Sequence, residues 1–203
     1  PRDAPEMKRE AVLDHGAEVF DCEPLLAARQ VMSEQVIERT GAAFIHPYDD
    51  ANVIAGQGTA ALELIEEVPD LDLIIAPIGG GGLMSGTCIA ARALDSRIRL
   101  FGAEPAGADD AARSLKEGEL IPQENPDTIC DGLLTSLGEL TWPILSTHLD
   151  DVITVSDEQV VEAMRLLFEL TGMIVEPSGA IPLAAAMSGD LPPSSRNGRI
   201  GLI

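Results

Sequence analysis

Residues 71–94 read LDLIIAPIGGGGLMSGTCIAARAL and hold the most informative pattern in the chain. The run 71–78 is apolar and rich in leucine and isoleucine, which predicts a strand covered on both faces. Four glycines follow, and the small and apolar residues of 83–94 then predict a helix. A buried strand, a glycine turn and a helix in this order predict one unit of a parallel α/β sheet.

The glycine run predicts an anion-binding loop. Successive residues without side chains permit a tight turn and expose backbone N–H groups, and the following helix adds its positive end. The dinucleotide pattern GxGxxG fails because Met84 or Ser85 stands at its last glycine, and the P-loop pattern fails because Thr87 replaces its lysine. A loop of this kind without lysine favours a monophosphate. The alternative is a tight strand-to-helix turn that binds nothing.

Helix and strand patterns alternate on both sides of this unit. We expect helices at 4–15, 24–40, 52–67, 83–94, from Ser156 onward, and 177–187. We expect strands at 17–20, 42–45, 71–78, 98–103, 151–155 and 200–203. This alternation predicts an open, mostly parallel twisted α/β sheet with helices on both faces. The proline-containing stretch 104–150 is expected to be mostly loop with one helix at 107–117, and 189–197 is expected to be a surface loop.

The amino-acid composition argues against several classes of binding partner. The chain has 34 acidic and 13 basic residues, which gives a net charge of −21. Such a surface repels nucleic acid and anionic membranes, and no apolar run is long enough to span a bilayer. Three widely spaced cysteines favour a reducing cytoplasm over a disulfide framework or a zinc site. The basic residues include only two lysines, which favours a saline cytoplasm in which salt screens the self-repulsion. The alternative is an ordinary acidic protein.

The two ends of the chain suggest a piece of a longer protein. The first residue is Pro1 rather than methionine, and the last five residues, 199–203, predict a buried strand that is cut short. We therefore expect further sequence on both sides.

Short motifs along the whole chain resemble one enzyme family. In order they are HPYDD at 46–50, VIAGQGT at 53–59, PIGGGGL at 77–83, AEP at 103–105, ADD at 108–110, DG at 131–132 and EPSGA at 176–180. The set resembles the pyridoxal-phosphate-dependent serine/threonine dehydratases, which have the tryptophan synthase β-like fold and include threonine ammonia-lyase and serine racemase.

The resemblance implies a domain plan and a reaction. Residues 1–48 would end a small domain and 49–203 would form most of a large cofactor-binding domain. Pyridoxal 5′-phosphate would be the cofactor, and threonine or serine would be converted to a 2-oxo acid and ammonia in a cytoplasmic homo-oligomer, a dimer. Neither Lys8 nor Lys116 matches the family's Schiff-base lysine, so the catalytic lysine is unknown and expected in a preceding segment. We expect the 203-residue chain alone to be inactive.

The resemblance also implies site residues. The residues implied in cofactor binding are Gly79, Gly80, Gly81, Gly82, Leu83, Gly132 and Glu176. The glycines and the Leu83 N–H would hold the phosphate, Gly132 would lie near the ring, and Glu176 would lie on the side of the pyridine nitrogen. The alternative for Glu176 is a carboxylate that only stabilises a helix start. Gln57 and Thr59 are expected at a helix start that faces the cofactor.

A second set of residues favours a hard cation. Glu104 and Asp110 are two carboxylates six residues apart, and the Ala108 carbonyl lies between them, a combination that suits Mg²⁺ or Ca²⁺ completed by waters. Carboxylate pairs are common by chance in so acidic a chain, so the alternative is surface acid. The resemblance to serine racemase-like enzymes favours the metal.

Three functions remain open. The first is a dehydratase that acts on small hydroxy amino acids. The second is serine racemase, which needs a further acid or base in a segment absent from this chain. The third is a phosphate- or pyridoxal-binding module that lacks the lysine and has no catalytic activity.

Overall fold

The computed structural model of this chain describes residues 2, 4, 6–192 and 198–203. The chain divides into two compact units, residues 1–45 and 46–203. Their assignment as the end of a small domain and a large cofactor-binding domain, with a boundary after residue 48, stays a prediction. Each unit is described by itself.

The first unit contains two helices, α1 (Glu6–Asp14) and α2 (Leu26–Thr40). Gly16, just after α1, and Gly41, directly after α2, have φ angles of 79° and 70°. Glycine adopts this left-handed conformation without strain, which explains why both helices end where they do.

The strands expected at 17–20 and 42–45 are wrong, because both segments are irregular. A strand is stable only beside another strand that completes its backbone hydrogen bonds, and no described residue of this unit forms one. The apolar alternation alone therefore does not produce a sheet here.

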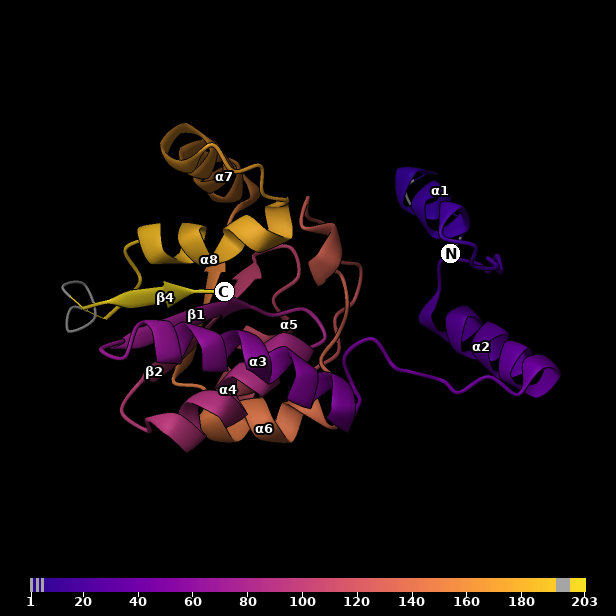
Figure 1. The fold of residues 1–203 in the computed structure, drawn as a ribbon, viewed down its shortest axis with the longest axis horizontal. Coiled ribbons are helices and arrows are strands. Elements are labelled where there is room, and N and C mark those ends of the chain that lie inside the picture. The colour runs from indigo at the N-terminus through magenta and orange to yellow at the C-terminus, as the bar shows by residue number, and fades with distance from the viewer. Residues whose placement is uncertain (1, 3, 5, 193–197) are drawn as a thin grey trace. The chain divides into compact units, whose positions relative to one another are not determined.

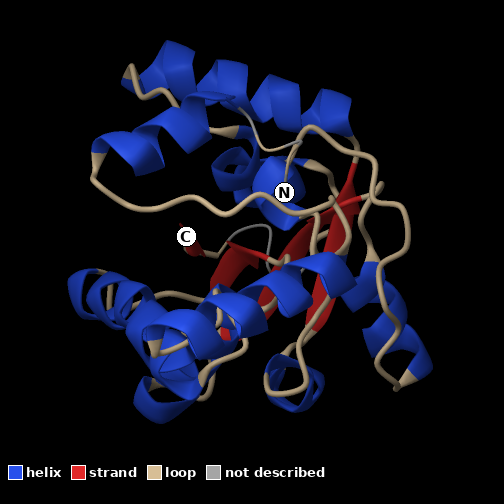
Figure 2. Ribbon diagram, turned by 90° about the vertical axis from the view of Figure 1, so that its right-hand side faces the viewer, coloured by secondary structure: helices blue, strands red, loops and turns tan. Residues whose placement is uncertain are grey.

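The second unit is built on one parallel sheet. Its strands are β1 (Leu73–Pro77), β2 (Arg99–Pro105), β3 (Asp151–Val155) and β4 (Ile200–Leu202). They lie in the order β3-β2-β1-β4, and every pair is parallel. Figure 2 shows the described strands as one twisted layer. The parallel sheet expected from the sequence is confirmed.

Helices cover both faces of this sheet. The helices of this unit are α3 (Ala51–Glu67), α4 (Gly82–Leu94), α5 (Asp110–Glu117), η1 (Asp131–Leu133), α6 (Thr141–His148), α7 (Asp157–Thr171) and α8 (Pro177–Met187). α3, α4 and α6 lie on one face, and α7 and α8 lie on the other (Figure 1). A separate apolar core fills each side, and the β1 residues alternate between the two cores. Among the described residues, no helix combines the length and the apolar character needed to cross a bilayer.

Helix α6 was not expected from the sequence. Pro143 suggested a loop, but it lies in the first turn of α6, where backbone N–H groups have no partner within the helix. The expected helix at 107–117 is shorter and begins at Asp110. Part of the expected loop at 189–197, residues 193–197, lies outside the described residues.

The starts of α7 and α3 show what a capping pattern can and cannot predict. Ser156 and Gln159 form the capping box expected for α7. The expectation for Gln57 and Thr59 is wrong: both are exposed in the middle of α3. Asp50 caps that helix instead, because its carboxylate accepts hydrogen bonds from the N–H groups of the first turn.

Candidate active site

The glycine loop lies at the carboxyl edge of the sheet, directly after β1. The chain leaves β1 through α4 to reach β2 on one side, whereas β4 on the other side is reached through α7 and α8 on the opposite face. Ligands of open α/β sheets bind at the carboxyl edge where the strand order reverses in this way. The fold therefore puts Gly79–Gly82 at the position where a ligand is expected.

The loop presents unpaired backbone donors. Gly81 precedes the first residue of α4 in a left-handed conformation, with φ 86° and ψ 0°. Among the described residues, none accepts a hydrogen bond from the N–H groups of Gly80, Gly81, Gly82 or Leu83. The first N–H groups of a helix have no partner within the helix, and the helix dipole adds a positive potential there. The loop can therefore hold an anion, and a phosphate group fits the donors present.

Close packing explains why the loop residues are glycines. A Cβ on Gly80 would lie 2.2 Å from Cγ of Tyr48, and one on Gly82 would lie 2.9 Å from Cβ of the same tyrosine. A Cβ on Gly81 would lie 2.9 Å from Cβ of Thr141. The side chain of Tyr48 thus covers one side of the loop and Thr141 supports another.

Two other implied cofactor residues lie in segments that meet this loop. A Cβ on Gly79 would lie 3.1 Å from the carbonyl oxygen of Gly132, so the loop and η1 are in close contact. The Gly132 N–H donates to Oγ of Ser178 over 3.1 Å, which ties η1 to the first turn of α8. Glu176 occupies the N-cap position of α8 and makes no side-chain capping bond.

Three residues at the loop were not found from the sequence. Tyr48 and Asp49 come from the segment before α3, and Thr141 starts α6. The carboxylate of Asp49 accepts hydrogen bonds from the N–H groups of residues 139–141 over 2.9–3.2 Å. The HPYDD motif at 46–50 was the available signal, but it does not say what these side chains contact.

His46 has a structural role within this motif. Its Nδ1 accepts hydrogen bonds from the N–H groups of Tyr48 and Asp49, the shorter over 2.8 Å. Its ring also makes an edge contact with the ring of Tyr48, with centroids 4.6 Å apart. These contacts shape the turn that presents Tyr48 and Asp49.

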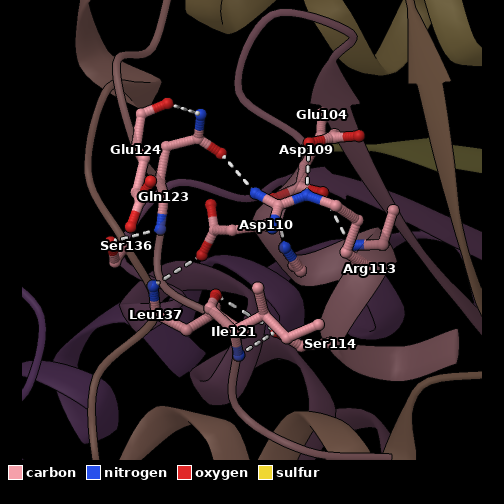
Figure 3. Close-up of polar contacts among 12 residues, drawn as sticks. Glu104, Asp109, Asp110, Arg113, Ser114, Ile121, Gln123, Glu124, Ser136 and Leu137 are labelled. Carbon is pink, nitrogen blue, oxygen red and sulfur yellow. Dashed lines mark hydrogen bonds and ion pairs between the residues drawn. The ribbon is translucent and has the colours of Figure 1, made fainter. Parts of the chain in front are cut away.

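The two carboxylates expected to bind a cation are both buried. Glu104 lies on β2 with 0% exposure, and Asp110 begins α5 with 1% exposure (Figure 3). The oxygens of Glu104 accept from the N–H groups of Ala111 and Ala112 over 3.0 and 2.8 Å. Asp110 accepts from the N–H of Leu137 over 2.9 Å. The alternative of surface acid does not apply, because neither side chain is on the surface.

Burial dominates the electrostatics of this pair. Loss of solvent raises the pKa of Glu104 to about 8, and the Ala112 N–H bond opposes that shift only in part. Loss of solvent also raises the pKa of Asp110 to about 6. A bound cation would stabilise both carboxylates in their charged form.

The backbone supplies a third oxygen. Ala108 is 1% exposed, and no described residue donates a hydrogen bond to its carbonyl. The described residues contain no group of three or more histidine, cysteine or acidic side chains around one point. Carboxylate and carbonyl oxygens are the ligand types that Mg²⁺ and Ca²⁺ prefer, whereas zinc prefers histidine and cysteine.

The positions of the two lysines in this chain do not suggest that either one is the Schiff-base lysine. Lys116 is exposed in the last turn of α5, and Lys8 is exposed on α1 in the other unit. Neither position gives a reason to assign a catalytic role.

The chain matches one known protein family over nearly its whole length. The family described as "Pyridoxal-phosphate dependent enzyme" matches residues 1–201. The chain belongs to this family. It is 46% identical to a serine racemase of Dictyostelium discoideum over its whole length, and 43% identical to a beta-hydroxyaspartate dehydratase of Paracoccus denitrificans. It covers 63% and 64% of those two proteins.

Solved structures of this family have the same fold. Maize serine racemase superposes with a TM-score of 0.96 at 45% identity and covers 100% of this chain and 63% of its own. A threonine deaminase from T.th. gives a TM-score of 0.90 at 43% identity, over 98% of this chain and 65% of its own. The tryptophan synthase β-like fold class is confirmed. The chain spans about three fifths of the length of these relatives.

Proposed function

We propose that the protein is a pyridoxal-phosphate-dependent dehydratase of small hydroxy amino acids. Threonine or serine would lose its α-proton and β-hydroxyl, and hydrolysis would yield a 2-oxo acid and ammonia. When bound, pyridoxal phosphate supplies the electron sink for removal of the α-proton. The observation that supports this most directly is the glycine loop after β1, whose N–H groups from Gly80 to Leu83 have no acceptor among the described residues.

In this proposal the chain's own residues hold the cofactor. The N–H groups of Gly79–Gly82 and Leu83 bind the phosphate, assisted by the positive end of α4. Gly132 lies beside the loop and contributes backbone contacts near the ring. Glu176, at the start of α8, faces the side of the pyridine nitrogen. A Cβ on Gly80, Gly81 or Gly82 would lie 2.2–2.9 Å from an atom of Tyr48 or Thr141, so these positions have no room for a side chain.

We also propose that Glu104, Asp110 and the Ala108 carbonyl bind Mg²⁺ or Ca²⁺. The support is the burial of both carboxylates, their raised pKa values and the unpaired carbonyl between them. The cation touches no reacting atom in this proposal. It holds the segment between β2 and α5 and so stabilises or activates the enzyme.

Serine racemase is the second candidate. The same cation site and the identity to serine racemases favour it. Racemisation requires an acid or base on the other face of the substrate, which we assign to no residue of this chain. A lysine-less binding module is the third candidate, and it would bind the cofactor without turnover.

Assays of the protein that contains this chain separate the three candidates. L-threonine and L-serine are supplied with pyridoxal phosphate and Mg²⁺, then 2-oxo acid is quantified and D-serine is resolved by chiral chromatography. A dehydratase releases 2-oxo acid from both substrates in excess of free cofactor. D-serine formed faster than 2-oxo acid would support the racemase instead. Cofactor binding without either product would leave only the binding module.

The proposal includes a homodimer in a cytoplasm of high salt. The support is an apolar groove of about 330 Å³ between α3 and α4, beside the exposed side chain of Ile89, and the charge of −21. Light scattering after gel filtration measures the oligomeric state. A monomer at micromolar concentration in molar KCl would contradict the dimer.

A further inference from the structure

One hydroxyl connects the glycine loop to helix α6. Oγ of Thr141 donates to the carbonyl oxygen of Gly80 over 2.8 Å and accepts from the N–H of Gly138 over 2.8 Å. Thr141 is fully buried, with 0% exposure. The Gly138 carbonyl oxygen is a second possible acceptor at 3.3 Å, so the Gly80 carbonyl is the closer acceptor of the single hydroxyl proton.

The bond to Gly80 determines where the next N–H points. In a trans peptide the carbonyl of residue 80 and the N–H of residue 81 point in opposite directions. Because the carbonyl of Gly80 faces Thr141, the N–H of Gly81 faces away from α6. Glycine permits a wide range of backbone angles, and the hydrogen bond from Thr141 stabilises the orientation observed for this peptide.

The position of Thr141 is itself held from outside the helix. The carboxylate of Asp49 accepts from the N–H groups of Leu140 and Thr141 over 2.9 and 3.2 Å. A Cβ on Gly138 would lie 2.1 Å from Oδ1 of the same aspartate, so the turn before α6 is packed directly on it. The neighbouring residue Tyr48 covers Gly80 from another side. Gly80 is therefore held between the ring of Tyr48 and the hydroxyl of Thr141.

We propose that Thr141 is a positioning residue for the cofactor phosphate. Its hydroxyl keeps the Gly80 carbonyl turned away from the anion, so that the Gly81 N–H can donate to it. If this peptide flipped, it would present a carbonyl oxygen to the phosphate, and a donor would be replaced by a repulsive dipole. The inference rests on the proposed function, in which this loop binds the phosphate.

The test compares ligands that differ only in the phosphate. Pyridoxine 5′-phosphate and pyridoxine lack the aldehyde, so neither reacts with a lysine. Their dissociation constants are measured by calorimetry for the wild type, Thr141→Val, Thr141→Ser and Thr147→Val. Thr147 is the matched control, because it lies on α6, is exposed, and its hydroxyl donates to the Pro143 carbonyl of its own helix.

Loss of one hydrogen bond and of the peptide's orientation should weaken pyridoxine 5′-phosphate binding by about tenfold in Thr141→Val. Pyridoxine binding should stay within about twofold, and Thr141→Ser and Thr147→Val should match the wild type for both ligands. This pattern supports the proposal, since a merely structural role would not discriminate by phosphate.

Two results would overturn the inference in distinguishable ways. If the wild type prefers the phosphorylated ligand but Thr141→Val loses affinity for both ligands equally, or for neither, Thr141 does not position the loop. If the wild type itself does not prefer the phosphorylated ligand, the phosphate site of the proposed function fails as well. Should Thr141→Val not fold, Asp49→Asn provides the second test: the same phosphate-selective loss supports the inference, and an equal or absent loss contradicts it.

Discussion

Helices α4 and α5 both start at the carboxyl edge of the same sheet, yet their N-termini are used in opposite ways. At α4 the first N–H groups have no acceptor among the described residues, and glycines surround them. At α5 the carboxylate of Glu104 accepts from Ala111 and Ala112 and occupies the equivalent donors. The first helix start is open to an external anion. The second is occupied by the carboxyl group of Glu104, a side chain of the protein itself, whose burial raises its pKa to about 8.

The comparison shows that a helix N-terminus has no fixed function. Both helices follow adjacent strands, β1 and β2, and both offer the same backbone groups. What differs is whether the preceding strand ends in a side chain that reaches the first turn. The α6 start is a third case, since Asp49 from a distant segment occupies its donors.

The strongest test of the open helix start is Gly81→Asp. A carboxylate at the anion site should lower pyridoxal phosphate affinity by on the order of a hundredfold or more, because like charges then meet in a buried place. Gly118→Asp is the matched control: Gly118 also has a positive φ angle, 77°, but an added Cβ would meet nothing within 4 Å. Bound cofactor is quantified by its visible absorbance after gel filtration. Unchanged cofactor content in Gly81→Asp would show that the loop is not the phosphate site.

The closed helix start is tested by Asp110→Asn. Removing one of the two buried charges should lower Mg²⁺ affinity by about tenfold or more and abolish metal activation, while cofactor absorbance stays the same. Asp109→Asn is the control, because that carboxylate is half-exposed and paired with Arg113. Activity is titrated with Mg²⁺ after chelation. If the wild type responds neither to the chelator nor to the metal, the cation site does not exist.

The raised pKa values predict how metal-free stability depends on pH. Glu104 has a pKa of about 8 in the folded chain and an ordinary value of 4.5 when unfolded, so the folded state binds the proton more tightly. The stability that this proton contributes is complete below pH 4.5 and is lost as the pH rises toward 8.

Thermal melting in chelator should therefore show Tm falling by about 5 °C or more between pH 5 and pH 8, and Glu104→Gln should reduce that slope. Mg²⁺ should restore much of the wild-type Tm at pH 8. A Tm that rises steadily over this range in the chelated wild type would contradict the raised pKa assigned to the buried Glu104.

Salt should affect the two helix starts in opposite directions, with the smallest effect of this series. The net charge of −21 repels an anion from α4 and attracts a cation to α5, and salt screens both effects. Between about 0.05 and 1 M KCl we expect pyridoxine 5′-phosphate to bind a few-fold more tightly and Mg²⁺ a few-fold more weakly. Calorimetry at both salt concentrations measures each. Parallel trends for the two ligands would indicate that net charge does not govern either site.

Local patterns were sufficient to predict much of the second unit. The apolar run before Gly79 and the alternation of helix and strand correctly indicated a parallel sheet. The capping box at Ser156 correctly indicated the start of α7. These features act over a few residues, so the amino-acid order alone expresses them. The two strands expected in the first unit are wrong for the same reason: a strand depends on a partner, which a local pattern does not contain.

The sequence by itself determined the family, the glycine loop and the candidate ligands Glu104 and Asp110, because each is carried by a short contiguous motif. Only the tertiary structure decided how those groups are used. Asp49 and Leu140 are 91 positions apart, and nothing near either residue specifies that they meet. Likewise, whether a carboxylate is solvated or buried depends on packing by distant segments, and burial is what raises the pKa of Glu104. Chemistry that depends on residue type was therefore evident in the sequence, whereas chemistry that depends on burial and long-range contact required the fold.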